Sequence, residues 1–383
     1  MNEKWKTVLI SVLTPSGIIS VISLTVLWGY FSRLDRLDVF FEVMDIKSIF
    51  ALVFCAVIIS LIFLMLVFFV ISILMTIVIP QDVSNLPNYD KIKSNLLIIL
   101  MISGLFPMVF VYFFYYVFNV GQAVKDYSAF LSLLSIGLMS IISSGILNRK
   151  YIEDNLSIKN KKVRFKVRCQ FYLSIPLSIA FLAHLQVFPL EIIFRNIHTS
   201  DDKVSFWAVA GIAFISYMVY FLTLLPGAVY LRMGTTDKVL KKFIAFFMVS
   251  MAVLLMISTR ITVIPVMFTH AVIKLSGISD FSPHSYIIKD TEYPEQFFTS
   301  PLWNKAPVKP GEYYAVRAVA LFNTNKFILI CPREIIKSYR ESWKFNPWDV
   351  EYDNSVRLKL QKDAAYCVPV SASAVKRWDV PLK

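Results

Sequence analysis

Long apolar runs follow one another over roughly the first 279 residues, and none occurs in about the last hundred. A helix needs about 20 residues to cross about 30 Å of hydrocarbon. About seven runs meet or approach this length: Val8–Tyr30, Ser48–Ile79, Leu96–Val120, Ala129–Ile146, Phe171–Phe194, Val204–Leu231 and Ile244–Thr259. The pattern predicts a polytopic α-helical membrane protein, with a transmembrane domain over residues 1–279 and a small soluble α+β domain over residues 280–383.

A further apolar stretch, Ile261–Leu275, follows the seventh run after only Thr259 and Arg260. No Gly, Asn or Pro stands there to reverse the chain, so an eighth span is disfavoured. The stretch is predicted to continue the seventh helix outward or to lie in the membrane interface, with a kink at Pro265.

The segment after the first run, residues 31–45, has the spacing of a short amphipathic helix. Leu34, Leu37, Phe41 and Met44 recur at helical intervals, and acidic residues fill another face. We expect this helix to rest on the outer membrane interface, while a docking element for a partner is the alternative.

Basic residues in the loops predict the orientation. The loop between the fourth and fifth runs, from Arg149 to Arg168, is the most basic, and about sixteen Lys and Arg residues fall on its side against about six on the other. Lys and Arg gather in cytoplasmic loops. The N-terminus is therefore predicted in the cytoplasm as a retained signal anchor, and the C-terminal domain outside, which is the periplasm for a bacterial inner-membrane protein.

The soluble domain shows alternating strand patterns with one helical stretch. Strands are predicted at Tyr313–Phe322, Lys326–Cys331, Arg357–Gln361 and Tyr366–Ser371, and a helix at Pro332–Trp343. The first two strands flank Asn323-Thr324-Asn325 and read as a hairpin. Cys331 and Cys367 are the only cysteines in this domain. In an oxidising compartment they predict a disulfide, with two unrelated buried thiols as the alternative.

Composition agrees with this class of protein. The chain is 57% hydrophobic, has a mean hydropathy of +0.62 and carries a formal net charge of +13. These values exclude a soluble or disordered chain. The positive charge is explained by cytoplasmic loops, and no basic motif with interleaved aromatics predicts nucleic-acid binding.

Catalytic, cofactor-binding and metal-binding motifs are not found in the sequence. The candidate functional polar residues in or near the membrane are His184, Glu191 and Arg260. His184 and Glu191 lie seven apart on one predicted helix and would share a face. A neutral His184 hydrogen-bonded to a neighbouring helix is the simpler interpretation. Gly137, Ser140 and Ser144 form a small face that favours close helix packing.

These features favour a non-catalytic integral inner-membrane protein without a cofactor, in contact with the lipid bilayer, whose periplasmic domain binds a protein partner. Immunity against a membrane-active toxin is the most concrete version, by analogy of architecture alone. A transporter or channel subunit is a second hypothesis. A membrane-bound enzyme acting on lipid or glycan is a third, and it would use Glu191, His198, Asp201 and Asp202, or Asp35 and Asp38.

Overall fold

The structure is a computed structural model of the chain, and it describes residues 14–44, 46–78, 91–92, 94–104, 122–156, 161–198, 206–233, 238–298, 302–308 and 313–378. Four helices in these ranges are long and apolar enough to cross a membrane: Pro15–Leu34, Ser48–Ile77, Ala210–Arg232 and Val239–Arg260. The finding supports a membrane protein, whereas the predicted number of seven spans is not confirmed.

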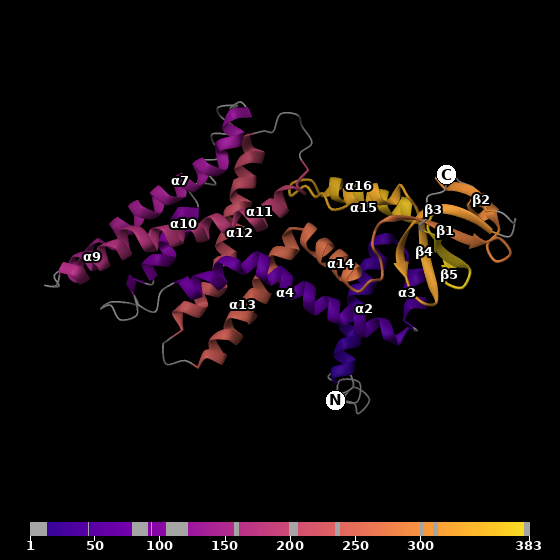
Figure 1. Cartoon of the computed structure of the whole chain (residues 1–383), viewed down its shortest axis with the longest axis horizontal. Coiled ribbons are helices and arrows are strands. Elements are labelled where there is room, and N and C mark those ends of the chain that lie inside the picture. The colour runs from indigo at the N-terminus through magenta and orange to yellow at the C-terminus, as the bar shows by residue number, and fades with distance from the viewer. Residues whose placement is uncertain are drawn as a thin grey trace. The chain divides into compact units, whose positions relative to one another are not determined.

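Most of the described chain is helical (Figure 1). The helices are α2 (Pro15–Leu34), α3 (Leu37–Val43), α4 (Lys47–Val78), α7 (Gln122–Leu147), α8 (Arg149–Leu156), α9 (Lys161–Cys169), α10 (Ile175–Leu185), α11 (Val187–Phe194), α12 (Phe206–Arg232), α13 (Val239–Arg260), α14 (Val263–Leu275), α15 (Ile335–Glu341) and α16 (Val350–Ala364). A π-helix, η1, covers Gln170–Ser174, and a 3₁₀ helix, η2, covers Glu295–Phe298.

The strands form one antiparallel sheet in the C-terminal part of the chain. They are β1 (Pro283–Lys289), β2 (Asn304–Val308), β3 (Tyr313–Asn323), β4 (Phe327–Pro332), β5 (Val368–Ser371) and β6 (Val375–Trp378). The order is β5-β4-β3-β1-β6, and β2 also pairs with β3. The predicted hairpin is confirmed as β3 and β4, and Thr324 closes its turn by accepting the Phe327 N–H at 3.1 Å.

The chain divides into two compact units. The first unit holds α2, α3, α4 as far as Leu64, residues Asn196–His198, and everything described from Ile261 onward. The second unit holds α4 from Met65 and helices α7 to α13. The sheet thus belongs to the same unit as α2, α3 and α14.

The core of the first unit forms where the end of α2 meets the sheet. Phe31 is fully buried, and its ring centroid lies 4.9 Å from that of Phe322 on β3. Tyr30 is also buried and donates its hydroxyl to the carbonyl oxygen of Leu321 at 2.7 Å. The first apolar run therefore serves as part of the domain core as well as a span-length helix.

Two predictions for the C-terminal domain differ from the structure: the predicted helix is present but shorter, and one predicted strand is helical. Pro332 ends β4, and α15 begins only at Ile335. Arg357–Gln361 is part of α16 and not a strand. Asp349 caps α16 by accepting the Tyr352 N–H at 3.0 Å, which satisfies one of the free donors at a helix start.

The fifth predicted span is not one helix. It is divided between η1, α10 and α11, and the chain leaves the helix at Gln186. The buried Gln186 side chain donates to Thr223 Oγ1 on α12 at 3.0 Å. A polar side chain buried among apolar helices needs such a partner, and here the partner comes from another helix.

For the stretch after the seventh run, the structure contradicts one of the two predicted alternatives, the continuation of the seventh helix, and a position in the membrane interface stays a prediction. The stretch does not continue α13, because the helix ends at Arg260 and a new helix, α14, starts at Val263. Pro265 lies in the first turn of α14, where the missing N–H leaves no hydrogen bond unmade, so no kink forms there. With 13 residues, α14 is shorter than a span.

The predicted amphipathic segment after the first run is divided at Asp35 between α2 and α3, so Leu34 does not share a helix face with Leu37, Phe41 and Met44. Leu34 is the last residue of α2 and is fully buried, and Asp35 turns the chain with φ at 56°. In α3 the buried residues are Val39, Phe40 and Val43. This face belongs to the same hydrophobic core as Phe31 and Phe322.

In the second unit the predicted small face on α7 is partly confirmed. Ser140 shares a hydrogen bond of 2.9 Å with Ser103, and Ser144 donates to the Phe171 carbonyl oxygen at 3.1 Å. Gly137, by contrast, has open space where a side chain would stand. Hydroxyl groups thus join α7 to its neighbours at Ser140 and Ser144.

Candidate functional site

An open hollow of about 560 Å³ lies along α15 in the C-terminal domain. Its charged lining residues are Arg333, Glu334, Lys337, Arg340, Glu341 and Lys344, and Pro283 at the start of β1 and Ile336 complete it. Arg333, Lys337, Arg340 and Lys344 are all exposed. Four cationic side chains against two acidic ones make this a positively charged surface.

The cations follow the helix geometry. Steps of three and four residues return to the same side of a helix, so the basic side chains line one face of α15 and its flanks. The opposite face carries the buried Ile335, Ser338 and Tyr339. The buried face fixes the direction of the basic face.

Few negative charges within the domain neutralise the cations of this surface. Among the described residues, none of the four cations forms an ion pair. Glu341 pairs with Lys359 of α16 at 2.7 Å, outside the hollow. That hydrogen bond holds the pKa of the Glu341 carboxyl below its usual value. The hollow can therefore receive an acidic or anionic group without displacing an internal partner.

The domain is held against α2 and the chain that follows it by two arginines. Arg33 donates to both the carbonyl oxygen and the hydroxyl of Ser342, just after α15. Arg36 donates to the Cys367 carbonyl oxygen at 2.5 Å and pairs with Asp38 at 2.8 Å. Guanidinium groups make strong bonds of this kind because the charge strengthens each one.

Residues Asn196–His198 are joined to the same domain. The Phe345 N–H donates to the Asn196 carbonyl oxygen at 2.8 Å, and the His198 N–H donates to the Phe345 carbonyl oxygen at 2.9 Å. The His198 ring stacks on Tyr352, with centroids 4.1 Å apart. Two segments far apart in sequence, residues 30–36 and 196–198, thus flank α15 and its C-terminal loop.

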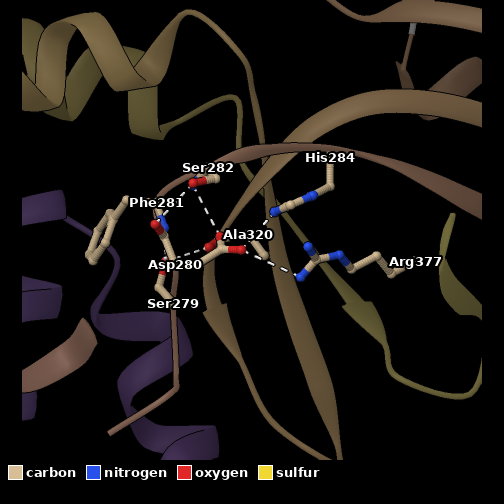
Figure 2. Close-up of polar contacts among 7 residues, drawn as sticks. All are labelled: Ser279, Asp280, Phe281, Ser282, His284, Ala320 and Arg377. Carbon is tan, nitrogen blue, oxygen red and sulfur yellow. Dashed lines mark hydrogen bonds and ion pairs between the residues drawn. The ribbon is translucent and has the colours of Figure 1, made fainter. Parts of the chain in front are cut away.

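A polar junction connects α14 to β1 beside the hollow (Figure 2). Asp280 Oδ2 lies 2.6 Å from His284 Nε2 and 3.4 Å from Arg377 Nη1, and Oδ1 accepts the Ser282 N–H at 3.0 Å. Burial alone would raise the pKa of Asp280, but the hydrogen bonds from Ser282 and His284 and the nearby positive charges outweigh it. The pKa of Asp280 is therefore lowered.

The backbone at this junction is strained and held in place. Phe281 has a φ of 52°, a left-handed conformation that costs about 1–2 kcal/mol in a residue with a side chain. Ser279 compensates, because its hydroxyl accepts the Phe281 N–H at 3.1 Å and donates to the Ala320 carbonyl oxygen at 2.6 Å. The Phe281 ring stacks on Tyr339, at 4.9 Å between centroids. The connection between α14 and the sheet is thereby defined.

An aspartate beside a histidine can serve general acid–base catalysis. Here Ser282, the nearby hydroxyl in the turn, donates to the carbonyl oxygen of Asp280 at 3.3 Å. These hydrogen bonds are those of a turn, and they give Asp280 a positioning role. In the part of the chain that the structure describes, no three His, Cys, Asp or Glu side chains gather as metal ligands.

The residues singled out from the sequence lie in separate places. The sulfur atoms of Cys331 and Cys367 are 2.03 Å apart, at disulfide distance. His184 is in the last turn of α10, with a buried Nδ1 that has no hydrogen-bond partner among the described residues, and Arg260 is the exposed end of α13. Because the chain breaks at Gln186, His184 and Glu191 do not share one helix face as predicted.

The acidic residues of the enzyme hypothesis are not gathered by the described chain. Asp35 is the turn residue after α2, and Asp38 is paired with Arg36. His198 stacks on Tyr352, while Asp201 and Asp202 lie outside the described residues. Asp38 and His198 therefore have structural contacts.

The basic face of α15 was not identified from the sequence, although its signal is present. The predicted helix at Pro332–Trp343 contains Arg333, Lys337 and Arg340 at helical spacing. No protein-family model, curated protein or solved structure matches the chain.

Proposed function

We propose that this chain is a non-catalytic integral protein of a bacterial inner membrane, and that its C-terminal domain binds an acidic protein partner in the periplasm. The basic hollow along α15 carries the proposal. Its four exposed cations form no ion pair among the described residues and outnumber the two acidic side chains of the hollow, and complementary charge speeds and orients protein association. Immunity against a membrane-active toxin is one concrete form of this function.

The topology of the first unit supports the periplasmic side. Tyr30 and Arg33 at the end of α2 bond to the C-terminal domain, so that end of α2 and the domain lie on one side of a membrane that α2 crosses. The segments 31–47, 196–198 and 261–280 meet in one unit, and the charge of the loops predicts all three outside. The Cys331–Cys367 pair is also suited to an oxidising compartment.

The hollow is held in place by the rest of the first unit, and such order favours binding. Ordering a surface at the moment of binding costs free energy, and a surface that is already ordered avoids this cost. The buried face of α15, the two arginines and the strand-like pairing at Phe345 order the hollow in advance.

Photo-crosslinking in intact cells tests the proposed partner. A photoreactive amino acid at Ile336, inside the hollow, should give one discrete adduct with an acidic protein. The adduct should be lost in the double variant Arg333→Glu and Arg340→Glu. It should persist in Lys362→Glu, an exposed cation on α16 outside the hollow. An adduct that survives the double charge reversal would contradict the proposal.

Thiol labelling tests the side of the membrane independently. With Cys55 and Cys169 replaced by serine, Lys362→Cys should react with a membrane-impermeant maleimide in intact cells. Arg149→Cys, an exposed residue of the basic loop predicted in the cytoplasm, should react only after lysis. The reverse pattern would place the domain in the cytoplasm and remove the periplasmic part of the proposal.

A further inference from the structure

Helix α3 has three distinct faces, which the 100° step of an α-helix separates. Val39, Phe40 and Val43 form the first face, which is buried in the core with Phe31 and Phe322. This packing fixes the rotation of the helix about its axis, so the directions of its other side chains are fixed as well.

The second face is apolar and exposed. Leu37, Phe41 and Met44 are 37%, 66% and 41% exposed, and their spacing of four and three residues places them within about one sixth of the helix circumference. Single exposed apolar residues are ordinary, whereas a cluster on one face marks a surface that another apolar phase covers.

The third face is acidic. Asp38 and Glu42 are exposed and lie about 100° or more from the centre of the exposed apolar face. Asp38 is paired with Arg36, which keeps its charge at the junction with the domain. Charged residues on one side and large apolar residues on another are the pattern of a helix at a lipid–water boundary.

The position of α3 along the chain indicates which apolar phase it meets. The span-length helix α2 ends at Leu34, and the next candidate span starts at Ser48. The connection between them is about a dozen residues long, so α3 stays close to the membrane surface at both of its ends. The two flanking spans therefore hold this face of α3 next to lipid, and lipid is the apolar phase that covers it.

We propose that Leu37, Phe41 and Met44 insert into the boundary between headgroups and acyl chains of the leaflet in which α2 ends. The opposite face of α3 carries the C-terminal domain, so the helix acts as a wedge between lipid and domain. It fixes the height at which the domain is held above the membrane. The inference holds for either side of the membrane and does not depend on the proposed partner.

Spin labels at adjacent positions test the wedge. The full chain, with Cys55 and Cys169 replaced by serine, carries Phe41→Cys or the matched control Glu42→Cys, and is reconstituted in vesicles of phosphatidylethanolamine and phosphatidylglycerol. The label at position 41 should collide with oxygen several times more often, relative to a water-soluble nickel complex, than the label at position 42. Both native side chains are exposed, so neither change disturbs the core.

Two outcomes would overturn the inference. Equal access of the nickel complex to both labels would show that the Phe41 face is in water. Protection of position 41 from both oxygen and nickel would show that protein covers the face, either another part of this chain or a second copy. Neither outcome affects crosslinking at Ile336, so failure of the wedge and failure of the proposed partner are distinguishable.

Discussion

The two units of this molecule are rich in the same apolar residues and are stabilised by different interactions. In the second unit, hydroxyl groups reach from helix to helix: Ser72 donates to the Thr223 carbonyl oxygen at 2.6 Å, and Tyr220 to that of Leu100 at 2.6 Å. In the first unit, aromatic rings pack around Phe31 and Phe322, in the same core as the Cys331–Cys367 pair. The second unit consists of apolar helices, whereas the first adds a sheet domain to α2 and part of α4. The difference is the one expected between helices surrounded by lipid and a sheet domain surrounded by water.

Lipid chains are as apolar as leucine, so helices in a membrane gain little by hiding apolar side chains from them. Close approach and hydrogen bonds between helices take that role. A domain in water gains about 25 cal/mol for each Å² of apolar surface it buries. The comparison predicts that core truncation is most damaging in the first unit and that added volume is most damaging in the second.

The largest expected effect is that of Phe31→Ala. Removing a fully buried ring from a packed core costs about 3–5 kcal/mol, because contacts are lost and a cavity remains. The measurement is the free energy of unfolding of the purified chain in detergent. Phe41→Ala, on the exposed face of α3, is the control and should change it little. Equal effects of the two changes would refute the assignment of Phe31 to the core.

Loss of the disulfide comes next. Replacing both Cys331 and Cys367 with serine should destabilise the first unit by about 3–4 kcal/mol, since the bond closes a loop of about 37 residues. Thermal unfolding with and without reductant measures it. Replacing Cys55 and Cys169 with serine is the matched control, because both are free thiols. A parent chain that is insensitive to reductant would contradict this prediction.

A smaller effect is expected for Gly104→Ala in the second unit. A methyl group there would clash with the buried Tyr220 ring, so the ring or the helices must shift, at a cost of about 1–3 kcal/mol. Gly29→Ala on α2 meets nothing within 4 Å and should be neutral or slightly stabilising. Stability measured in detergent should separate the two variants, and equal values would show that α12 does not pack so closely.

The smallest effect is the acid sensitivity conferred by Asp280. Its pKa is lowered in the folded domain, so its stabilising contribution is present above the unfolded value of about 3.9 and is lost as pH falls through the folded value. Asp280→Asn should therefore lose less melting temperature between pH 5 and pH 3 than the parent. Because the side chain is 44% exposed, the difference should be small. A steeper loss in the variant would reverse the sign.

Elements defined by neighbouring residues could be predicted from the sequence. The hairpin follows from the polar turn Asn323-Thr324-Asn325 between two apolar runs, and strand β5 from the alternation that begins near Tyr366. Arg357–Gln361 shows why such patterns can mislead. Leu358 and Leu360 alternate with charged residues as in a strand, yet Leu358 is 51% exposed and only Leu360 is buried.

Features that depend on distant residues could not be predicted. The break at Gln186 is matched by Thr223, and the basic hollow needs Pro283 to lie beside α15. The spacing of residues near Gln186 or near α15 does not indicate either distant partner. The cations on α15 could have been identified from their intervals, but the absence of internal partners depends on the folded structure.

The hydrogen bond from Tyr30 to Leu321 can form only late in synthesis of the chain. The two residues are separated by 291 positions in the chain. At about 5–20 residues per second, a ribosome makes Leu321 roughly 15–60 s after Tyr30. During that interval the first helix is already in place while Phe31 and Arg33 have no domain to receive them. The nascent chain therefore passes through a long-lived intermediate in which the residues of α2 that contact the domain are still unbound. This is the stage at which chaperones and proteases would act on it.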